Sequence, residues 1–131
     1  MFALHFVAPG PRWLHPPLTW AGIPIVLAGM AISGAGGRSL ADHGTTVLPG
    51  VRPEALVTDG PYRWSRNPMY LGMLVSLLGL AVFFGTLVPA LVLPAFGAWL
   101  HVRFVRAEER ALEERFGEPY RDWRARVRRW L

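Results

Sequence analysis

The residues best suited to chemistry lie in two short polar segments that flank a long uncharged run. Residues 60–70 and 106–109 contain side chains that can bind a polar ligand or move a proton: Tyr62, Arg66, Asn67, Tyr70, Arg106, Glu108 and Glu109. A carboxylate can bind an ammonium group, and a guanidinium group can bind a carboxylate. Polar groups at membrane depth are costly and are functional candidates there. The alternative role for the same residues is interfacial anchoring by long arginines and by tyrosines.

The uncharged run predicts a transmembrane hairpin. From Met69 to Val102 there are 34 residues without Asp, Glu, Lys or Arg. As one helix they would extend about 51 Å, against a hydrocarbon core of about 30 Å. Two helices over 68–84 and 87–104 fit, and they bring both polar segments to one membrane surface. Asn67 and Glu108 are then expected to line one pocket. A buried hairpin in a soluble bundle is the alternative, although few domains of this size could bury such a run.

A second uncharged run, from Trp13 to Gly37, predicts another span that begins after Pro16-Pro17. Pro24 is expected to kink this helix or to end its first turn. Its small residues suit close packing, within one chain or across a homo-oligomer: Gly22, Ala28, Gly29, Gly34, Gly36 and Gly37. The apolar piece Met1–Val7 is too short to span and lacks the features of a signal peptide.

The charge distribution predicts the orientation of these spans. All 14 basic residues are arginine and the net charge is +5, with nine arginines between 103 and 131. Three spans place the tail and the loop on one side, which the positive-inside rule makes cytoplasmic. The bilayer and its anionic headgroups explain the basic excess, and nucleic-acid binding is not predicted because no recognition motif is present.

The predicted fold is therefore all-α: one integral membrane domain with about three transmembrane helices. An N-terminal segment and first span cover 1–37, a cytoplasmic loop covers 38–67, the hairpin covers 68–104 and a cytoplasmic helical tail covers 105–131. Cysteine is absent and the four histidines are scattered, so no metal site is predicted. The glycine-rich stretch 33–37 ends a helix and does not follow a strand, which excludes a Rossmann site.

The tail predicts two helices. The first is expected to end near Phe116, with Gly117 as its stop. It places Glu108 on an apolar stripe, where the carboxylate needs a cation, hydrogen-bond donors or a proton. The second is a basic amphipathic helix whose apolar face holds Tyr120, Trp123, Val127 and Trp130. This helix can lie in the plane of the interface or fold back over the pocket between the spans.

Residues 44–47 and 56–72 resemble the front half of the isoprenylcysteine carboxyl methyltransferase superfamily, which includes the phospholipid methyltransferases. Residues 108–123 and 127–130 resemble its back half, so the resemblance covers about residues 40–131. It implies an integral membrane methyltransferase dependent on S-adenosylmethionine. The cofactor would bind in a cytoplasmic pocket formed by the hairpin and the tail, and the acceptor would enter from the bilayer. A prenylcysteine carboxylate, a phospholipid amine, an isoprenoid and a small thiol all remain open as acceptor.

The resemblance also implies roles for individual residues. The family's Arg-His-Pro-x-Tyr element falls on Arg66, Asn67, Pro68 and Tyr70, with Asn67 in the place of the histidine, and its Glu-Glu pair falls on Glu108 and Glu109. The catalytic candidates are Arg66, Asn67 and Glu109. The cofactor-binding candidates are Tyr62, Arg66, Asn67, Tyr70, Gly72, Arg106, Glu108, Glu109 and Tyr120. The chain resembles the shorter, prokaryote-like branch, which implies a prokaryotic inner membrane.

Two other functions are consistent with part of this pattern. One is a membrane interaction protein without catalysis, although a scaffold requires neither polar segment. The other is an NADPH-dependent membrane reductase of related architecture, whose larger size and additional spans argue against it here.

Overall fold

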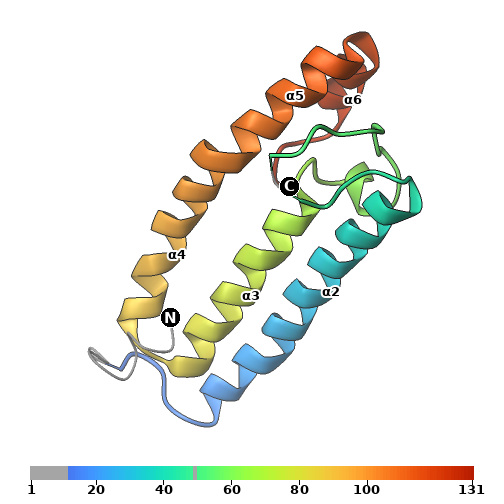
Figure 1. The fold of residues 1–131 in the computed structure, drawn as a ribbon. Coiled ribbons are helices and arrows are strands. Elements are labelled where there is room, and N and C mark those ends of the chain that lie inside the picture. Colours follow the sequence, from blue (N-terminus) through green and yellow to red (C-terminus); the bar gives the residue numbers. More distant parts are fainter. Residues whose placement is uncertain (1–11, 49) are drawn as a thin grey trace.

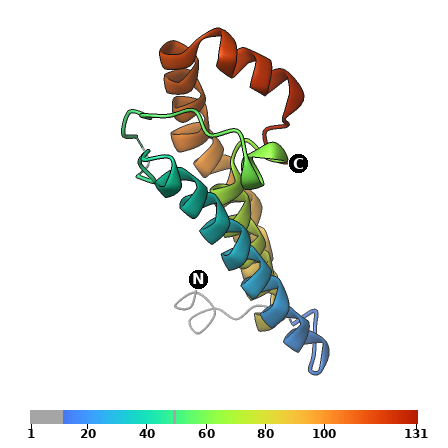
Figure 2. The same cartoon turned by 90° about the vertical axis from the view of Figure 1, so that its right-hand side faces the viewer.

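The computed structural model describes residues 12–48 and 50–131, and every regular element in this part of the chain is helical (Figures 1 and 2). The α-helices are α2 (Gly22–Asp42), α3 (Pro68–Phe84), α4 (Leu87–Leu100), α5 (Arg106–Phe116) and α6 (Glu118–Arg126). Short 3-10 helices cover Leu18–Ala21 and Gly60–Arg63, and a π-helical turn covers His101–Val105. The prediction of an all-α fold is confirmed, while the expectation for residues 1–7 lies outside the described residues.

The hairpin forms where the sequence predicts it. Pro68 occupies the first turn of α3, where its missing N–H costs no helical hydrogen bond. After Phe84 the chain reverses at Gly85, whose φ of 63° is left-handed and whose N–H donates to the Ala81 carbonyl. A side chain at Gly85 would also meet the Leu14 carbonyl oxygen, so glycine is needed there for both conformation and space. The reversal brings α4 back beside α3 (Figure 1).

Helices α2 and α3 form the most extensive contact between described elements. Glycines seven residues apart meet across this interface: Gly22, Gly29 and Gly36 on α2, and Gly72 and Gly79 on α3. A Cβ atom built on Gly72 would lie 2.5 Å from the Gly29 carbonyl oxygen and 2.8 Å from Ser33 Cα. Small residues let helix backbones approach closely where no hydrophobic force drives association. Of the small residues predicted to form this packing face, Gly22, Gly29 and Gly36 are confirmed. Ala28 is exposed, Gly34 has open space, and Gly37 approaches only the end of the Met69 side chain.

Two helical stretches are long and apolar enough to cross a membrane by length and composition: Leu18–Asp42 and Val88–Phe116. The helix Pro68–Phe84 is apolar but has only 17 residues. Two candidate spans are therefore established, and the third remains a prediction. Pro24 lies in the first turn of α2, one of the two positions expected for it.

The boundary predicted between the first span and the loop was wrong. Helix α2 does not end at Gly37 but continues to Asp42. Its last turns are stabilised because Leu40 packs against the buried cluster that contains Val57 and Tyr62. The helix ends where Gly44 adopts a left-handed φ of 66°. The following loop is thus shorter than predicted.

The second tail helix was predicted too long. Helix α5 ends at Phe116 before Gly117, as expected, but α6 stops at Arg126, and Val127 is extended. The last residues are extended because their carbonyl groups bind outside the helix: the Arg66 N–H donates to the Arg128 carbonyl at 2.9 Å. The tail folds back over the ends of α2 and α3, which is one of the two arrangements expected from the sequence (Figure 2). We call residues 127–131 the C-terminal strap.

Substituting Gly72 with Ala tests the close contact between α2 and α3. The added methyl group would overlap backbone atoms that cannot rotate away, so we expect a loss of about 1–3 kcal/mol of stability and a lower midpoint of thermal unfolding in detergent. Gly34→Ala is the matched control because a Cβ atom there meets nothing within 4 Å. Equal midpoints for the two variants would contradict this account of the interface.

Candidate functional site

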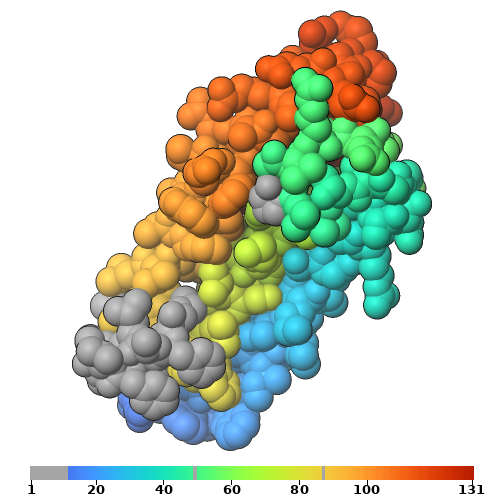
Figure 3. All heavy atoms as spheres, viewed as in Figure 1, coloured from blue at the N-terminus to red at the C-terminus, as the bar shows by residue number. Residues whose placement is uncertain are grey.

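A cavity of about 550 Å³ lies at the end of the helices where α3 begins and α5 leaves α4. Its wall is mostly apolar and comes mainly from the loop residues 45–48 and 50–57, the start of α3, the end of α4, α5 and α6. Leu40 of α2, Tyr62 of the second 3-10 helix and Phe104 of the π-turn complete it. The green atoms of the loop lie beside the orange atoms of α5 in the space-filling view (Figure 3). Asn67 and Glu108 both line this cavity, so the juxtaposition expected from the hairpin is observed.

Glu108 is held by a tyrosine from the neighbouring helix. The Tyr70 hydroxyl donates to Glu108 Oε1 at 2.6 Å, and both residues line the cavity. Tyr70 is buried and stacks on Phe104, with ring centroids 6.4 Å apart. A carboxylate in such apolar surroundings requires donors, and the sequence expectation that Glu108 would find one is met by Tyr70. The second Glu108 oxygen is free of any such donor among the described residues, which leaves it available to a ligand.

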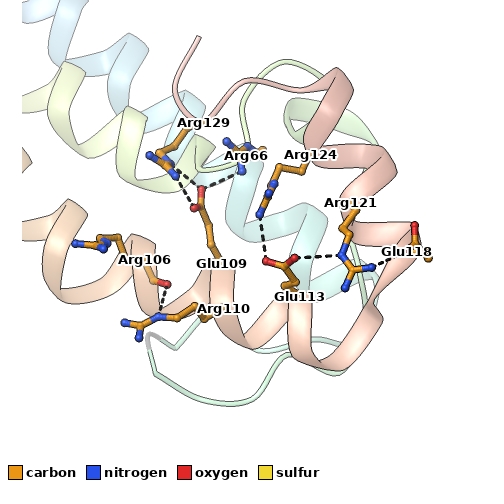
Figure 4. A network of polar contacts seen from close by, with 9 residues as sticks. All are labelled: Arg66, Arg106, Glu109, Arg110, Glu113, Glu118, Arg121, Arg124 and Arg129. Atoms are coloured by element: carbon orange, nitrogen blue, oxygen red, sulfur yellow. Dashed lines mark hydrogen bonds and ion pairs between the residues drawn. The ribbon is translucent and has the colours of Figure 1, made fainter.

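Glu109 is paired with two arginines (Figure 4). The Arg129 guanidinium donates through Nε and Nη2 to the two carboxylate oxygens, each at 2.8 Å. Arg66 Nη1 lies 3.1 Å from Glu109 Oε1. The side chains of Arg66 and Glu109 are only 11% and 13% exposed. Bidentate, charge-assisted contacts of this kind are strong and fix geometry, so Glu109 joins α5, the residue before α3 and the C-terminal strap.

Asn67 attaches the strap as well. Its side-chain N–H donates to the Arg129 carbonyl at 3.0 Å, and the Ser65 hydroxyl lies 3.4 Å from the same oxygen. The Asn67 backbone N–H donates to Ser65 Oγ at 3.1 Å. Both side chains are buried. The side chain of Asn67 therefore orders the strap across one end of the cavity.

Aromatic side chains enclose the other side. Tyr62, Tyr120 and Trp123 belong to one buried cluster, and the Trp123 indole N–H donates to the Tyr62 carbonyl at 3.1 Å. Burial raises the pKa of Tyr62, and the Glu108 charge adds to the effect. Burial and the charge of Glu109 raise the pKa of Tyr120 more than the nearby Arg66 lowers it. Both phenols are thus neutral donors at physiological pH.

Within residues 12–48 and 50–131, three buried polar atoms of cavity-lining residues lack a protein partner of good hydrogen-bond geometry. They are Nε and Nη1 of Arg66 and the hydroxyl of Tyr120, and of these Nη1 is paired electrostatically with Glu109. Buried donors are normally satisfied, and an unpaired one calls for an explanation such as a bound molecule. Nε of Arg66 and the Tyr120 hydroxyl are available to a polar ligand.

Two of the predicted site residues do not reach the cavity. Arg106 is exposed, and Gly72 faces α2. The helical period explains Arg106: at about 100° per residue, Arg106 and Glu108 lie almost opposite each other around α5, so they cannot both face the cavity. Gly72 serves the contact between helices. The remaining candidates all line the cavity: Tyr62, Arg66, Asn67, Tyr70, Glu108, Glu109 and Tyr120.

Sequence reasoning missed the loop 45–57 as a wall of the cavity and Arg129 as the partner of Glu109. The loop gave a usable signal, because long connections without regular structure are often functional. Its base is fixed by Thr45, whose hydroxyl accepts from the Glu54 N–H at 3.0 Å. The pairing of Arg129 with Glu109 was not predicted, although Arg129 matches the tail motif of the resembling family, because neither charge nor spacing assigns one of the nine arginines in the tail to Glu109.

A shallower apolar groove adjoins the cavity. Met30 and Gly34 of α2 and Leu77 of α3 contribute to its wall, which contains no ionisable side chain among the described residues. The groove and the cavity share four residues, namely Val47, Met69, Met73 and Phe96. The two spaces therefore meet at these residues, and methionine there can adapt to different apolar shapes.

Replacing Glu109 with Ala tests the ionic connection. Arg66 would remain buried without its counter-ion, which costs about 3 kcal/mol for a buried pair, and the strap would lose its strongest attachment. We expect a lower thermal midpoint and faster proteolysis after residue 126, measured by limited digestion in detergent. Glu114→Ala on the exposed side of the same helix is the control and should change neither. An unchanged digestion pattern in Glu109→Ala would show that the pair does not hold the strap.

Comparison with known proteins agrees with this architecture. Residues 18–119 match the family model of the phospholipid methyltransferases. The chain is 32% identical over 104 residues to the cobalt-zinc-cadmium resistance protein CzcN of Cupriavidus metallidurans, covering 76% of this chain and 46% of that protein. It is 31% identical over 104 residues to the uncharacterized protein YpbQ of Bacillus subtilis, covering 76% of this chain and 60% of that one. The match thus spans about half the length of these relatives. The chain belongs to the phospholipid methyltransferase family.

Proposed function

We propose that this protein is an integral membrane methyltransferase that transfers a methyl group from S-adenosylmethionine to a lipophilic or small acceptor. The observation that carries the proposal is the cavity at the ends of the hairpin, where Glu108 and Arg66 both have unsatisfied bonding capacity. The Glu108 carboxylate and the Arg66 guanidinium group lie within one apolar cavity, and this combination suits a ligand that carries both an ammonium group and a carboxylate.

The residues present fit such a cofactor. Glu108 would hold the ammonium group, and Arg66 Nε together with the Tyr120 hydroxyl would hold the carboxylate. Tyr62 and Trp123 would supply the flat apolar surface that an adenine requires. The volume of about 550 Å³ lies within the range of small-molecule sites. When bound, S-adenosylmethionine supplies a reactive methyl group on a sulfonium sulfur.

The protein's own contribution is positioning. Displacement at a sulfonium methyl needs an in-line arrangement and no covalent enzyme intermediate, so rate enhancement comes mainly from orientation. Tyr70 fixes Glu108, and the ion pairs of Glu109 fix Arg66. We therefore assign Asn67 and Glu109 to positioning rather than to proton transfer, because the Glu109 carboxylate already accepts from Arg129 through both oxygens.

The apolar groove suggests how an acceptor is accommodated. It meets the cavity at Val47, Met69, Met73 and Phe96, and its wall offers no charge to a headgroup. An acceptor with a hydrocarbon chain would place that chain in the groove and its reacting atom in the cavity. A prenylcysteine carboxylate, a phospholipid amine and an isoprenoid meet this requirement, and a small thiol needs only the cavity.

We further propose three spans with the cavity on the cytoplasmic side of a prokaryotic inner membrane. Helix α3 has 17 residues, which extend about 26 Å and approach the hydrocarbon thickness of about 30 Å. Exposed tryptophans support this placement: Trp13 and Trp20 at the far end of the helices, and Trp64 and Trp99 near the cavity. Tryptophan favours both membrane interfaces.

Binding of S-adenosylhomocysteine to the detergent-solubilised protein, measured by calorimetry, tests the proposal. We expect saturable binding at sub-millimolar ligand, and a loss of at least tenfold in affinity for Glu108→Ala because the ammonium group loses its counter-charge. Glu114→Ala should bind like the wild type. Absence of heat in a folded wild-type sample would favour a membrane protein without catalysis, while unchanged affinity in Glu108→Ala would show that this carboxylate is misassigned.

Incubation with a native lipid extract and cofactor labelled in the methyl group would identify the acceptor. Label in a lipid fraction would support the groove as the site of the acceptor chain. Label only in water-soluble thiols would contradict that part of the proposal and leave cofactor binding intact.

A further inference from the structure

Three arginines of the helix that leaves α4 lie outside the cavity and have no assigned role. They are Arg103, Arg106 and Arg110, and all three are exposed. Their spacing of three and four residues places them on one side of the helix. We call this set the arginine face. Arg106 and Arg110 point away from the ion pairs of Glu109 in the close view (Figure 4).

The arginine face has no anionic partner within the described part of the protein. Arg110 Nε donates to the Arg106 carbonyl at 3.3 Å, and the Arg103 guanidinium lies 5.5 Å from the Phe104 ring centroid. Neither contact neutralises charge. Elsewhere in the tail, by contrast, Glu113 pairs with two arginines, Arg121 and Arg124. Three exposed positive charges on one surface therefore create a local positive potential that attracts anions.

The position of this face indicates the source of such an anion. It directly follows the apolar helix α4, whose Trp99 is 53% exposed, and adjoins Val102, which is 63% exposed. Apolar side chains so exposed belong next to lipid, and charges one or two turns further along belong at headgroup depth. Guanidinium groups bind phosphate oxygens in a bidentate manner.

We propose that the arginine face binds the phosphate headgroup of an anionic phospholipid from the leaflet on the cavity side. The bound lipid would hold α5 at a fixed depth, and with it Glu108 and Glu109 of the same helix, which line the cavity. This site is distinct from the cavity and does not depend on methyl transfer. Each arginine near an anionic surface contributes about a fivefold preference.

Native mass spectrometry of the full chain in detergent with equal amounts of phosphatidylglycerol and phosphatidylcholine tests this site. The wild type should retain phosphatidylglycerol preferentially. The variant R103Q/R106Q/R110Q should lose at least tenfold of that preference, whereas R103K/R106K/R110K should keep most of it. The matched control R115Q/R124Q/R126Q removes the same charge from exposed positions at the end of α5 and on α6, and should bind like the wild type.

Equal losses in the two glutamine variants would overturn the proposal, because the preference would then follow net charge and not a site. No preference in the wild type would overturn it as well. If R103Q/R106Q/R110Q loses helicity by circular dichroism, two other measurements decide the question. The lysine variant must keep the preference for phosphatidylglycerol. The wild type must lose this preference at about 1 M salt, where the screening length is about 3 Å. Binding of S-adenosylhomocysteine, measured in parallel, separates this outcome from that of the proposed activity.

Discussion

The arrangement around the cavity depends on the carboxylate of Glu109. It receives Arg66 from the segment before α3 and Arg129 from the C-terminal strap, and it belongs to α5 itself. Three stretches that are remote in sequence are thereby fixed at one point. Because the contact is buried, loss of one charged partner would leave the others unpaired at a large cost in folding free energy. The bidentate pairing of Arg129 with Glu109 also fixes the relative orientation of the two side chains. The cavity keeps its shape because these three walls cannot move independently.

Close packing of α2 against α3 provides the frame for that arrangement. With glycines at the interface, the two helices approach until backbone touches backbone, so a side chain added at these glycines would overlap the facing helix. The bulk needed to line a cavity is instead gathered on the α4 side, from Phe96, Trp99 and Phe104. The chain thus forms a tightly packed interface between α2 and α3 and a cavity on the side of α4.

The sequence predicted those features that depend on local pattern. The limits of the hairpin, the stop at Gly117 and the meeting of Asn67 with Glu108 followed from charge-free length, helix-ending residues and the geometry of a reversal. The end of α2 and the extended strap did not follow, because tertiary contacts decide them. Leu40 prolongs a helix by packing on Val57 and Tyr62, and the carbonyl groups of the strap are taken by the segment before α3.

The residue types of the candidate site were predictable from the sequence, but the side of the helix on which each side chain lies was less so. Seven of the expected side chains line the cavity. Gly72 was expected there from the family resemblance and Arg106 from its position after the hairpin, and neither lines the cavity. Spacing along a chain does not specify which side of a helix faces a neighbour when a non-α turn lies in between. The partner of Glu109 was invisible for a different reason, since only the folded tail distinguishes Arg129 from the arginines around it.

That non-α turn, His101–Val105, has a consequence for how this protein could change over time. A π-turn is the trace of one additional residue accommodated within a helix. Because the extra residue is taken up within the turn, the helix after it keeps the rotation of an uninterrupted α-helix that has one residue fewer. Loss of one residue at this turn would therefore restore regular winding with Glu108 and Glu109 still directed at the cavity. Loss of one residue from the first regular turn of α5 would instead rotate everything after it by about 100°, so the turn is the point along α4 and α5 where a change of length disturbs the site least.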